Sequence, residues 1–145
     1  MKWIALITWV LTAGGGFVML GLWLKHGGMQ QSDRSGARIR AGRILSHFGL
    51  AATGLVVWII YVASDSNVLA WIAFALVAIV ALLGFSMFAI WLGQRRRPTP
   101  PVTASANSTD AAEQRFPVPV VGLHGILAAA TLVLVLLTAA GVGGS

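Results

Sequence analysis

Two histidines lie inside apolar stretches of this chain, His47 in RILSHFGLAATG (residues 43–54) and His124 in GLHGILAAAT (residues 122–131). Ionisable side chains are uncommon inside long apolar segments, and those that occur usually face the interior of a helical bundle. A neutral imidazole can coordinate a metal, carry a proton or hydrogen-bond to a neighbouring helix. Which of these it does depends on the elements that position the two rings.

The composition indicates an integral membrane protein. Of the 145 residues, 57% are hydrophobic and only 10% are charged, and the mean hydropathy is +0.84. Soluble domains carry about 25% charged residues, far more than this chain. The chain has no cysteine, which excludes disulfides, Cys-ligated zinc and iron–sulfur clusters. Any redox chemistry must therefore come from a cofactor.

Four apolar segments are long enough to cross a bilayer, which takes about 20 residues of helix. They span residues 3–24, 44–63, 68–92 and 117–142. Lipid offers no hydrogen-bond partner to the backbone, so each segment is expected to be a helix. The fold class predicted is all-α, a polytopic membrane protein with a four-transmembrane-helix bundle as a single domain over residues 1–145. Residues 94–116, rich in Pro, Ser and Thr, are predicted to form a flexible cytoplasmic linker within it.

The first segment shares a positive start and small residues with a signal peptide, but its apolar run continues through Leu24, which favours a retained helix. Nearly all lysines and arginines lie in the loops after the first and third segments. The positive-inside rule places these loops in the cytoplasm and both termini outside. The basic charge then belongs against anionic lipid headgroups, not against nucleic acid. The tryptophans near the segment ends, Trp3, Trp23, Trp71 and Trp91, are expected to be interfacial anchors.

This topology predicts that the two histidines lie at similar depth. His47 lies about one turn, or roughly 5 Å, inside the second segment, and His124 about one to two turns, or roughly 6 to 10 Å, inside the fourth. Both segments enter from the cytoplasmic side. Small residues follow each histidine at the i+4 and i+7 spacing that keeps them on one helical face: Ala51 and Gly54 after His47, Ala128 and Thr131 after His124, with Gly49 close to the first ring. These positions predict room for a flat, bulky ligand between the second and fourth helices.

Glycines elsewhere suit close helix packing. The run Gly14-Gly15-Gly16 is the exception, because three consecutive glycines weaken a helix. It indicates a bend or the close approach of another group.

The stretches Leu45–Gly54 and Leu123–Ala130, together with the four-helix plan, resemble the small membrane cytochromes of the cytochrome b561-like type. The resemblance implies that His47 and His124 are the axial ligands of one b-type haem, for electron transfer or for redox or haem sensing. Arg43, one turn before His47, is the expected partner of a haem propionate. The small residues Gly49, Ala51, Gly54 and Ala128 are the expected neighbours of the ring system.

Other functions remain open from the sequence. The chain also suits a non-catalytic accessory or scaffold subunit of a larger membrane complex, packed against other membrane subunits or a second copy through its small-residue faces. Metal or proton handling by His47 and His124 is a further alternative, although the helices carry no acidic residue and Met19 and Met87 are isolated. The sequence contains no set of serine, histidine and acidic residues at catalytic spacing that would indicate a hydrolytic enzyme. The alanine-rich composition, with arginine favoured over lysine, suggests a bacterial cytoplasmic membrane.

Overall fold

A computed structural model describes residues 1–32, 39–96 and 111–142. These residues form four long helices, α1 (Lys2–Lys25), α3 (Ala41–Ser64), α4 (Asn67–Arg95) and α5 (Val118–Ala139). The short helix α2 (Gly28–Ser32) follows α1, and the 3₁₀ helix η1 (Ala112–Arg115) precedes α5. No strand occurs in these three ranges. The all-α class predicted from hydropathy is confirmed.

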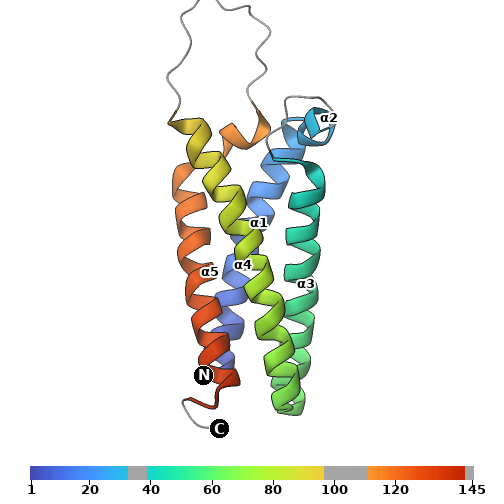
Figure 1. Ribbon diagram of the computed structural model, residues 1–145, viewed down its shortest axis with the longest axis vertical. Coiled ribbons are helices and arrows are strands. Elements are labelled where there is room, and N and C mark those ends of the chain that lie inside the picture. The colour runs from blue at the N-terminus through green and yellow to red at the C-terminus, as the bar shows by residue number, and fades with distance from the viewer. Residues whose placement is uncertain (33–38, 97–110, 143–145) are drawn as a thin grey trace, which may run out of the picture.

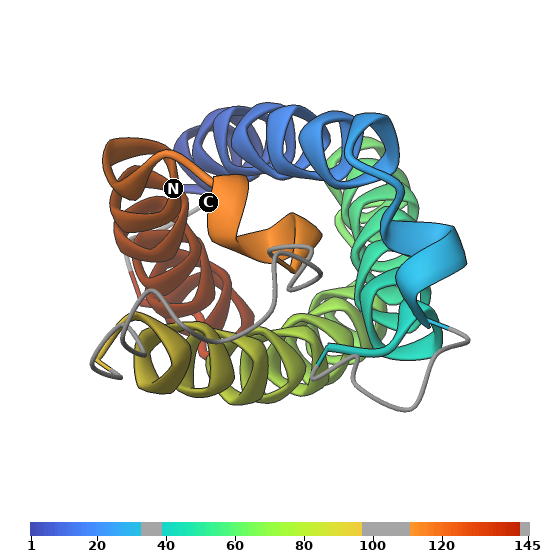
Figure 2. The same cartoon turned by 90° about the horizontal axis from the view of Figure 1, so that it is seen from above.

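The long helices run side by side as a four-helix bundle (Figure 1). Seen from above, the four follow one another around the bundle (Figure 2), so that α3 lies diagonally opposite α5 and α1 opposite α4. The backbones of helices adjacent in this order lie close together, whereas those of the two diagonal pairs do not. Both chain termini lie at one end of the bundle, and α2 and η1 lie at the other (Figure 1). We call these the terminal end and the basic end.

Each long helix is apolar and long enough to span a bilayer. Large apolar side chains cover their outer surfaces; among the most exposed are Val68, Leu82, Phe85 and Ile126. Such a surface suits lipid and not water. The chain is therefore a multi-pass membrane protein, as its composition predicts.

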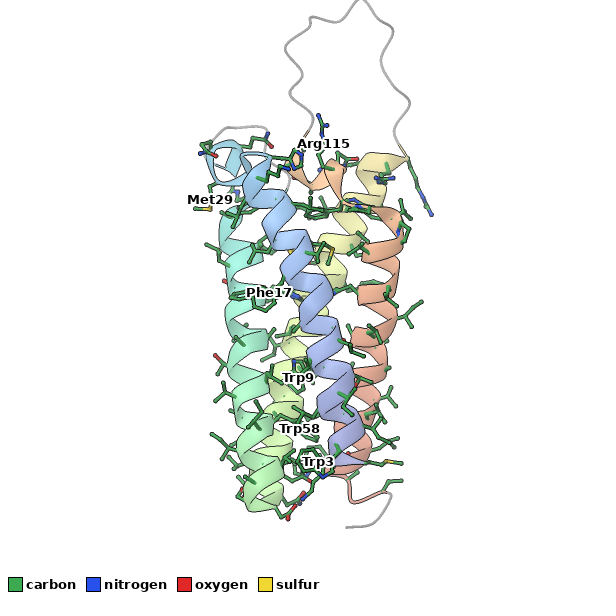
Figure 3. All side chains as sticks on the ribbon, turned by 180° about the vertical axis from the view of Figure 1, so that it is seen from behind. Trp3, Trp9, Phe17, Met29, Trp58 and Arg115 are labelled. Atoms are coloured by element: carbon green, nitrogen blue, oxygen red, sulfur yellow. The ribbon has the colours of Figure 1, made fainter. Side chains whose placement is uncertain are left out.

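The closely packed core lies in the half of the bundle near the terminal end. Its buried residues are Ala5, Trp9, Trp58, Tyr61, Ala70, Ala73, Val77, Val135 and Ala139. Trp58 stacks obliquely between Trp9 and Tyr61, at centroid distances of 6.3 and 4.7 Å. Its indole N–H donates to the Lys2 carbonyl at 3.3 Å, which satisfies the one polar group of this side chain. Figure 3 shows Trp9 and Trp58 one above the other in this half.

Both ends of the predicted linker, residues 94–116, include helical residues. Helix α4 continues to Arg95, and η1 folds across the basic end of the bundle (Figure 2). Glu113 of η1 is only 4% exposed and accepts a hydrogen bond from Gln94 Nε2 at 3.1 Å. Arg95 donates to the carbonyls of Gln114 and Phe116, both at 3.3 Å. Side chains at the end of α4 thus form hydrogen bonds with η1 and with the residue that follows it. The rest of the predicted linker, residues 97–110, lies outside the described residues.

The prediction of four tryptophan anchors is wrong for two of them. Trp3 and Trp71 are exposed near the terminal end, as expected for the membrane interface. Trp23 and Trp91, at the basic end, are only 1% and 5% exposed. A Cβ on Gly28 would lie 2.1 Å from Trp23 Cε2, so this glycine lets α2 close over the indole. Both rings therefore pack inside the protein and do not anchor it in lipid headgroups.

Candidate functional site

The bundle brings His47 and His124 together. Each is the seventh residue of its helix, counted from Ala41 in α3 and from Val118 in α5. These two helices start at the same end of the bundle (Figure 1) and are diagonally opposite. The two histidines therefore lie at the same level and face each other across the bundle. Their ring centroids are 6.4 Å apart and the ring planes are tilted by 54°. The similar depth predicted from the arginine distribution holds in the structure.

Each imidazole is held by a backbone carbonyl of a neighbouring helix. His47 Nδ1 donates to the Val80 carbonyl of α4 at 3.0 Å, and His124 Nδ1 donates to the Thr12 carbonyl of α1 at 2.9 Å. A carbonyl can only accept, so the proton of each neutral ring lies on Nδ1 and the lone pair lies on Nε2. This arrangement fixes the ring orientation and leaves Nε2 able to bind a metal, as outer-shell partners of metal-binding histidines do.

Glycines on α1 and α4 allow the rings to lie this close to the backbone. A Cβ on Gly84 would lie 3.0 Å from His47 Cε1, and one on Gly16 would lie 3.3 Å from His124 Cε1. A Cβ on Gly15 would contact His124 at 3.5 Å. The close approach of another group, predicted as one explanation for the glycine run, is therefore confirmed, with His124 as that group.

The two halves of the site match in sequence as well as in space. GFVMLGLW in α1 (residues 16–23) and GFSMFAIW in α4 (residues 84–91) share glycine, phenylalanine, methionine and tryptophan at identical spacing. In both repeats, the carbonyl that accepts from a histidine lies four residues before the glycine, at Thr12 and at Val80. The two tryptophans, Trp23 and Trp91, are both buried. The site thus has an approximate two-fold axis along the bundle, which relates α1 to α4 and α3 to α5.

This repeat is a sequence signal of the site that hydropathy and residue spacing alone did not reveal. It links His47 to Gly84 and Val80, and His124 to Gly16 and Thr12, although each set comes from distant parts of the chain. A search for internal similarity between the first and third apolar segments finds it. Its presence ties the glycines to the histidines, where glycine content alone predicted only helix packing.

The histidines lie in a layer that is less closely filled than the core. Residues 13–22, 40–53, 81–90 and 118–130, all of them described, contain no buried residue. The layer is bounded toward the terminal end by four buried residues, Thr12, Gly54, Val80 and Thr131. Toward the basic end it is bounded by the buried side chains of Trp23, Trp91, Ile39 and Glu113. Within it, both imidazoles are half-buried, and protein side chains do not enclose them completely.

The other predicted site residues are distributed unevenly around this layer. Ala51 and Ala128 are half-buried, one helical turn beyond their histidines. Gly49 is exposed and a Cβ there would meet nothing within 4 Å, and Arg43 is exposed in the first turn of α3. Gly54 is buried against Trp9, whose ring would lie 3.1 Å from a Cβ there. The space predicted beyond His47 is thus filled at Gly54 by a tryptophan.

The donor set distinguishes between a bare metal ion and haem iron. In the described part of the chain, no three histidine or acidic side chains lie together as a possible metal site. Zinc sites use three or four protein ligands, which this pair cannot supply. Haem iron takes four of its ligands from the porphyrin and only its axial ligands from the protein. The His47–His124 pair, with ring centroids 6.4 Å apart, could supply such a pair of protein ligands.

Comparison with family models, with curated proteins and with solved structures finds no match for this chain. Its function has to follow from the geometry of the His47–His124 pair and of the residues that hold it.

Proposed function

We propose that this protein is a small membrane cytochrome that holds one b-type haem between His47 and His124. The observation that carries this proposal is the placement of two imidazoles at the same level of diagonally opposite helices, 6.4 Å apart, each with its Nδ1 bonded to a backbone carbonyl. When bound, the haem supplies one-electron chemistry, for electron transfer or for the sensing of redox state or haem. The cytochrome b561-like resemblance agrees with this function.

The chain's own residues have distinct roles in the proposal. His47 and His124 would hold the haem iron, and the Val80 and Thr12 carbonyls hold the two rings in orientation and tautomer. Gly16 and Gly84 keep the ring positions free of side chains. Ala51 and Ala128 are half-buried and have small side chains one helical turn beyond their histidines. Arg43, exposed at the start of α3, is the expected propionate partner.

We place the protein in the cytoplasmic membrane of a bacterium, with the basic end in the cytoplasm and both termini outside. The support for the orientation is the distribution of charge: Lys25, Arg40, Arg43, Arg95 and Arg96 lie at the basic end, whereas Lys2 lies at the terminal end beside Asp65. The bacterial membrane is proposed from the alanine-rich composition and the preference for arginine over lysine. A fusion of a reporter active only in the cytoplasm to each terminus tests this orientation. Activity of the reporter at either terminus would contradict it.

The function is tested by the visible absorption spectrum of the purified protein, oxidised and dithionite-reduced, after expression with sufficient haem. We expect a b-type spectrum in the wild type and its loss in His47→Ala and in His124→Ala. His26→Ala is the matched control, because His26 lies at the end of α1, where its Nδ1 donates to the Leu22 carbonyl at 2.7 Å. Its spectrum should equal that of the wild type.

The rival function is a purely structural histidine pair, which would serve a scaffold or accessory subunit. In that case each ring contributes only its bond to the neighbouring helix, about 0.6 to 2 kcal/mol. His47→Met separates the two functions, because a thioether can replace an imidazole on haem iron and raises the reduction potential. A shifted spectrum and potential in this variant would support the cytochrome. A protein without a haem band in any variant would overturn the cytochrome proposal.

A further inference from the structure

The histidine pair lies much nearer to one end of the bundle than to the other. Six residues of helix, or about 9 Å, separate His47 and His124 from the first residues of α3 and α5. Toward the terminal end, α3 continues to Ser64 and α5 to Ala139, about 22 to 26 Å further. Electron tunnelling falls steeply with distance, so a centre at this level exchanges electrons far more readily through the basic end.

The terminal half is also closed to soluble molecules. Trp9, Trp58 and Tyr61 fill its centre, together with Val135, and all four are buried. This packing leaves no approach to the histidines from the terminal side. The basic end differs: in the described part of the chain, the buried side chains of Trp23, Trp91, Ile39 and Glu113 bound the histidine layer on this side. The short helix η1 lies across the same end (Figure 2).

The surface of the basic end is positively charged. Lys25, Arg40, Arg43, Arg95 and Arg96 are all exposed there. Among the residues that the structure describes at this end, Glu113 has the only carboxylate. This carboxylate is buried and accepts a hydrogen bond from Gln94. Figure 3 shows Arg115 of η1 at this end of the bundle and Trp3 at the other end. At the terminal end, Lys2 is paired with Asp65, so no comparable field arises.

We propose that the basic end is the docking face for a soluble redox partner whose own contact surface is acidic. This inference rests on the proposed haem function. The haem that His47 and His124 would hold would supply one-electron exchange with this partner, in which the donor loses one electron and the acceptor gains one, with no bond made or broken. Opposite charges on the two surfaces steer the encounter and place the partner over η1, at the shortest path to the histidines.

The test uses the haem-loaded protein in nanodiscs of zwitterionic lipid, where both ends are accessible. The dithionite-reduced protein is mixed with ferricyanide, an anion, or with hexaammineruthenium(III), a cation. We expect the rate with ferricyanide to fall as salt is added and the rate with the ruthenium complex to rise. Arg40→Gln/Arg96→Gln should slow ferricyanide about threefold or more at low salt, and should have little effect at high salt. Lys2→Gln, at the terminal end, is the matched control and should leave both rates unchanged.

A second readout does not depend on haem. Binding of poly-L-glutamate to the same nanodiscs should weaken in Arg40→Gln/Arg96→Gln and remain in Lys2→Gln and in His47→Ala. If the spectrum shows haem but the rates and the binding ignore these charges, the docking face is wrong and the proposed function stands. If the double substitution instead changes only the retention of anionic lipid, the basic residues serve the membrane and the proposal fails. A protein without haem overturns the electron exchange together with the proposed function.

Discussion

The two halves of the bundle are built from the same four helices but are packed differently. In the terminal half, Trp9, Trp58 and Tyr61 interlock with small residues on α4 and α5, and the interior is closed. In the histidine half, a full layer of all four helices contains no buried residue, and two imidazoles meet across it. The difference indicates that the buried aromatic core of the terminal half contributes more to the stability of the bundle than the histidine half does.

The largest effect on stability is expected from a substitution in the terminal half. Trp58→Ala removes a fully buried indole and its hydrogen bond to the Lys2 carbonyl, and should lower the free energy of unfolding by about 3 to 5 kcal/mol. Unfolding in mixed detergent, followed by circular dichroism, measures this loss. Trp71→Ala is the control, because Trp71 is exposed on α4. Equal losses in the two variants would show that burial of the Trp58 indole does not stabilise the terminal half.

The next largest effect on stability is expected when haem binds in the histidine half. Haem at about 100 times its dissociation constant should stabilise the folded protein by about 2.7 kcal/mol, because it binds only the native state. The measurement is the melting temperature with and without haem, and His47→Ala/His124→Ala should show no response. Hydrogen exchange should slow mainly around the histidine layer. Protection spread evenly over both halves would contradict the division between them.

A smaller effect is expected at the glycines beside the rings. Gly84→Ala places a Cβ 3.0 Å from His47 Cε1, and the overpacking should cost about 1 to 3 kcal/mol and weaken haem binding. Gly125→Ala is the matched control, since nothing lies within 4 Å of the corresponding position. Haem affinity is measured by titration of the apoprotein. An unchanged affinity in Gly84→Ala would show that the His47 ring can move away at no cost.

The smallest effect is expected at the boundary between the halves. Thr12 Oγ1 and Thr131 Oγ1 lie 3.4 Å apart there, and each hydroxyl also donates to its own helix. Thr131→Val keeps the shape and removes this polar contact, so the loss of stability should be about 0.6 kcal/mol. The same detergent unfolding measures it. A loss several times larger would mean that the boundary and not the aromatic core holds the bundle together.

Much of this architecture follows from residue order alone. Segments of about 20 apolar residues in lipid have to be helices, because no other partner exists for their backbone groups. The arginines place His47 and His124 at one level, since helical rise converts sequence distance into depth. The glycine run before Phe17 already indicates a close contact, although its partner, His124, is 108 residues away from Gly16.

Other features required the tertiary structure. Which helices are diagonal decides whether the two rings meet, and the helix order in the chain does not determine this. The carbonyls of Thr12 and Val80 carry no side-chain signal at all. Trp23 and Trp91 lie at positions typical of interfacial anchors, but in the folded chain both rings are buried, Trp23 against Gly28 of α2 and Trp91 beneath the guanidinium of Arg95.

The same physical distinction separates the two kinds of result. Hydropathy, chain length and charge act locally along the sequence, and they determine four membrane-spanning helices with one histidine at the same depth in each of two. The contact between those histidines depends on side chains from all four helices, on Gly16 and Gly84 leaving room, and on Trp9 filling the space at Gly54. Packing is a property of pairs of surfaces, so only the assembled bundle decides that the imidazoles lie 6.4 Å apart with Nε2 unbonded to the backbone.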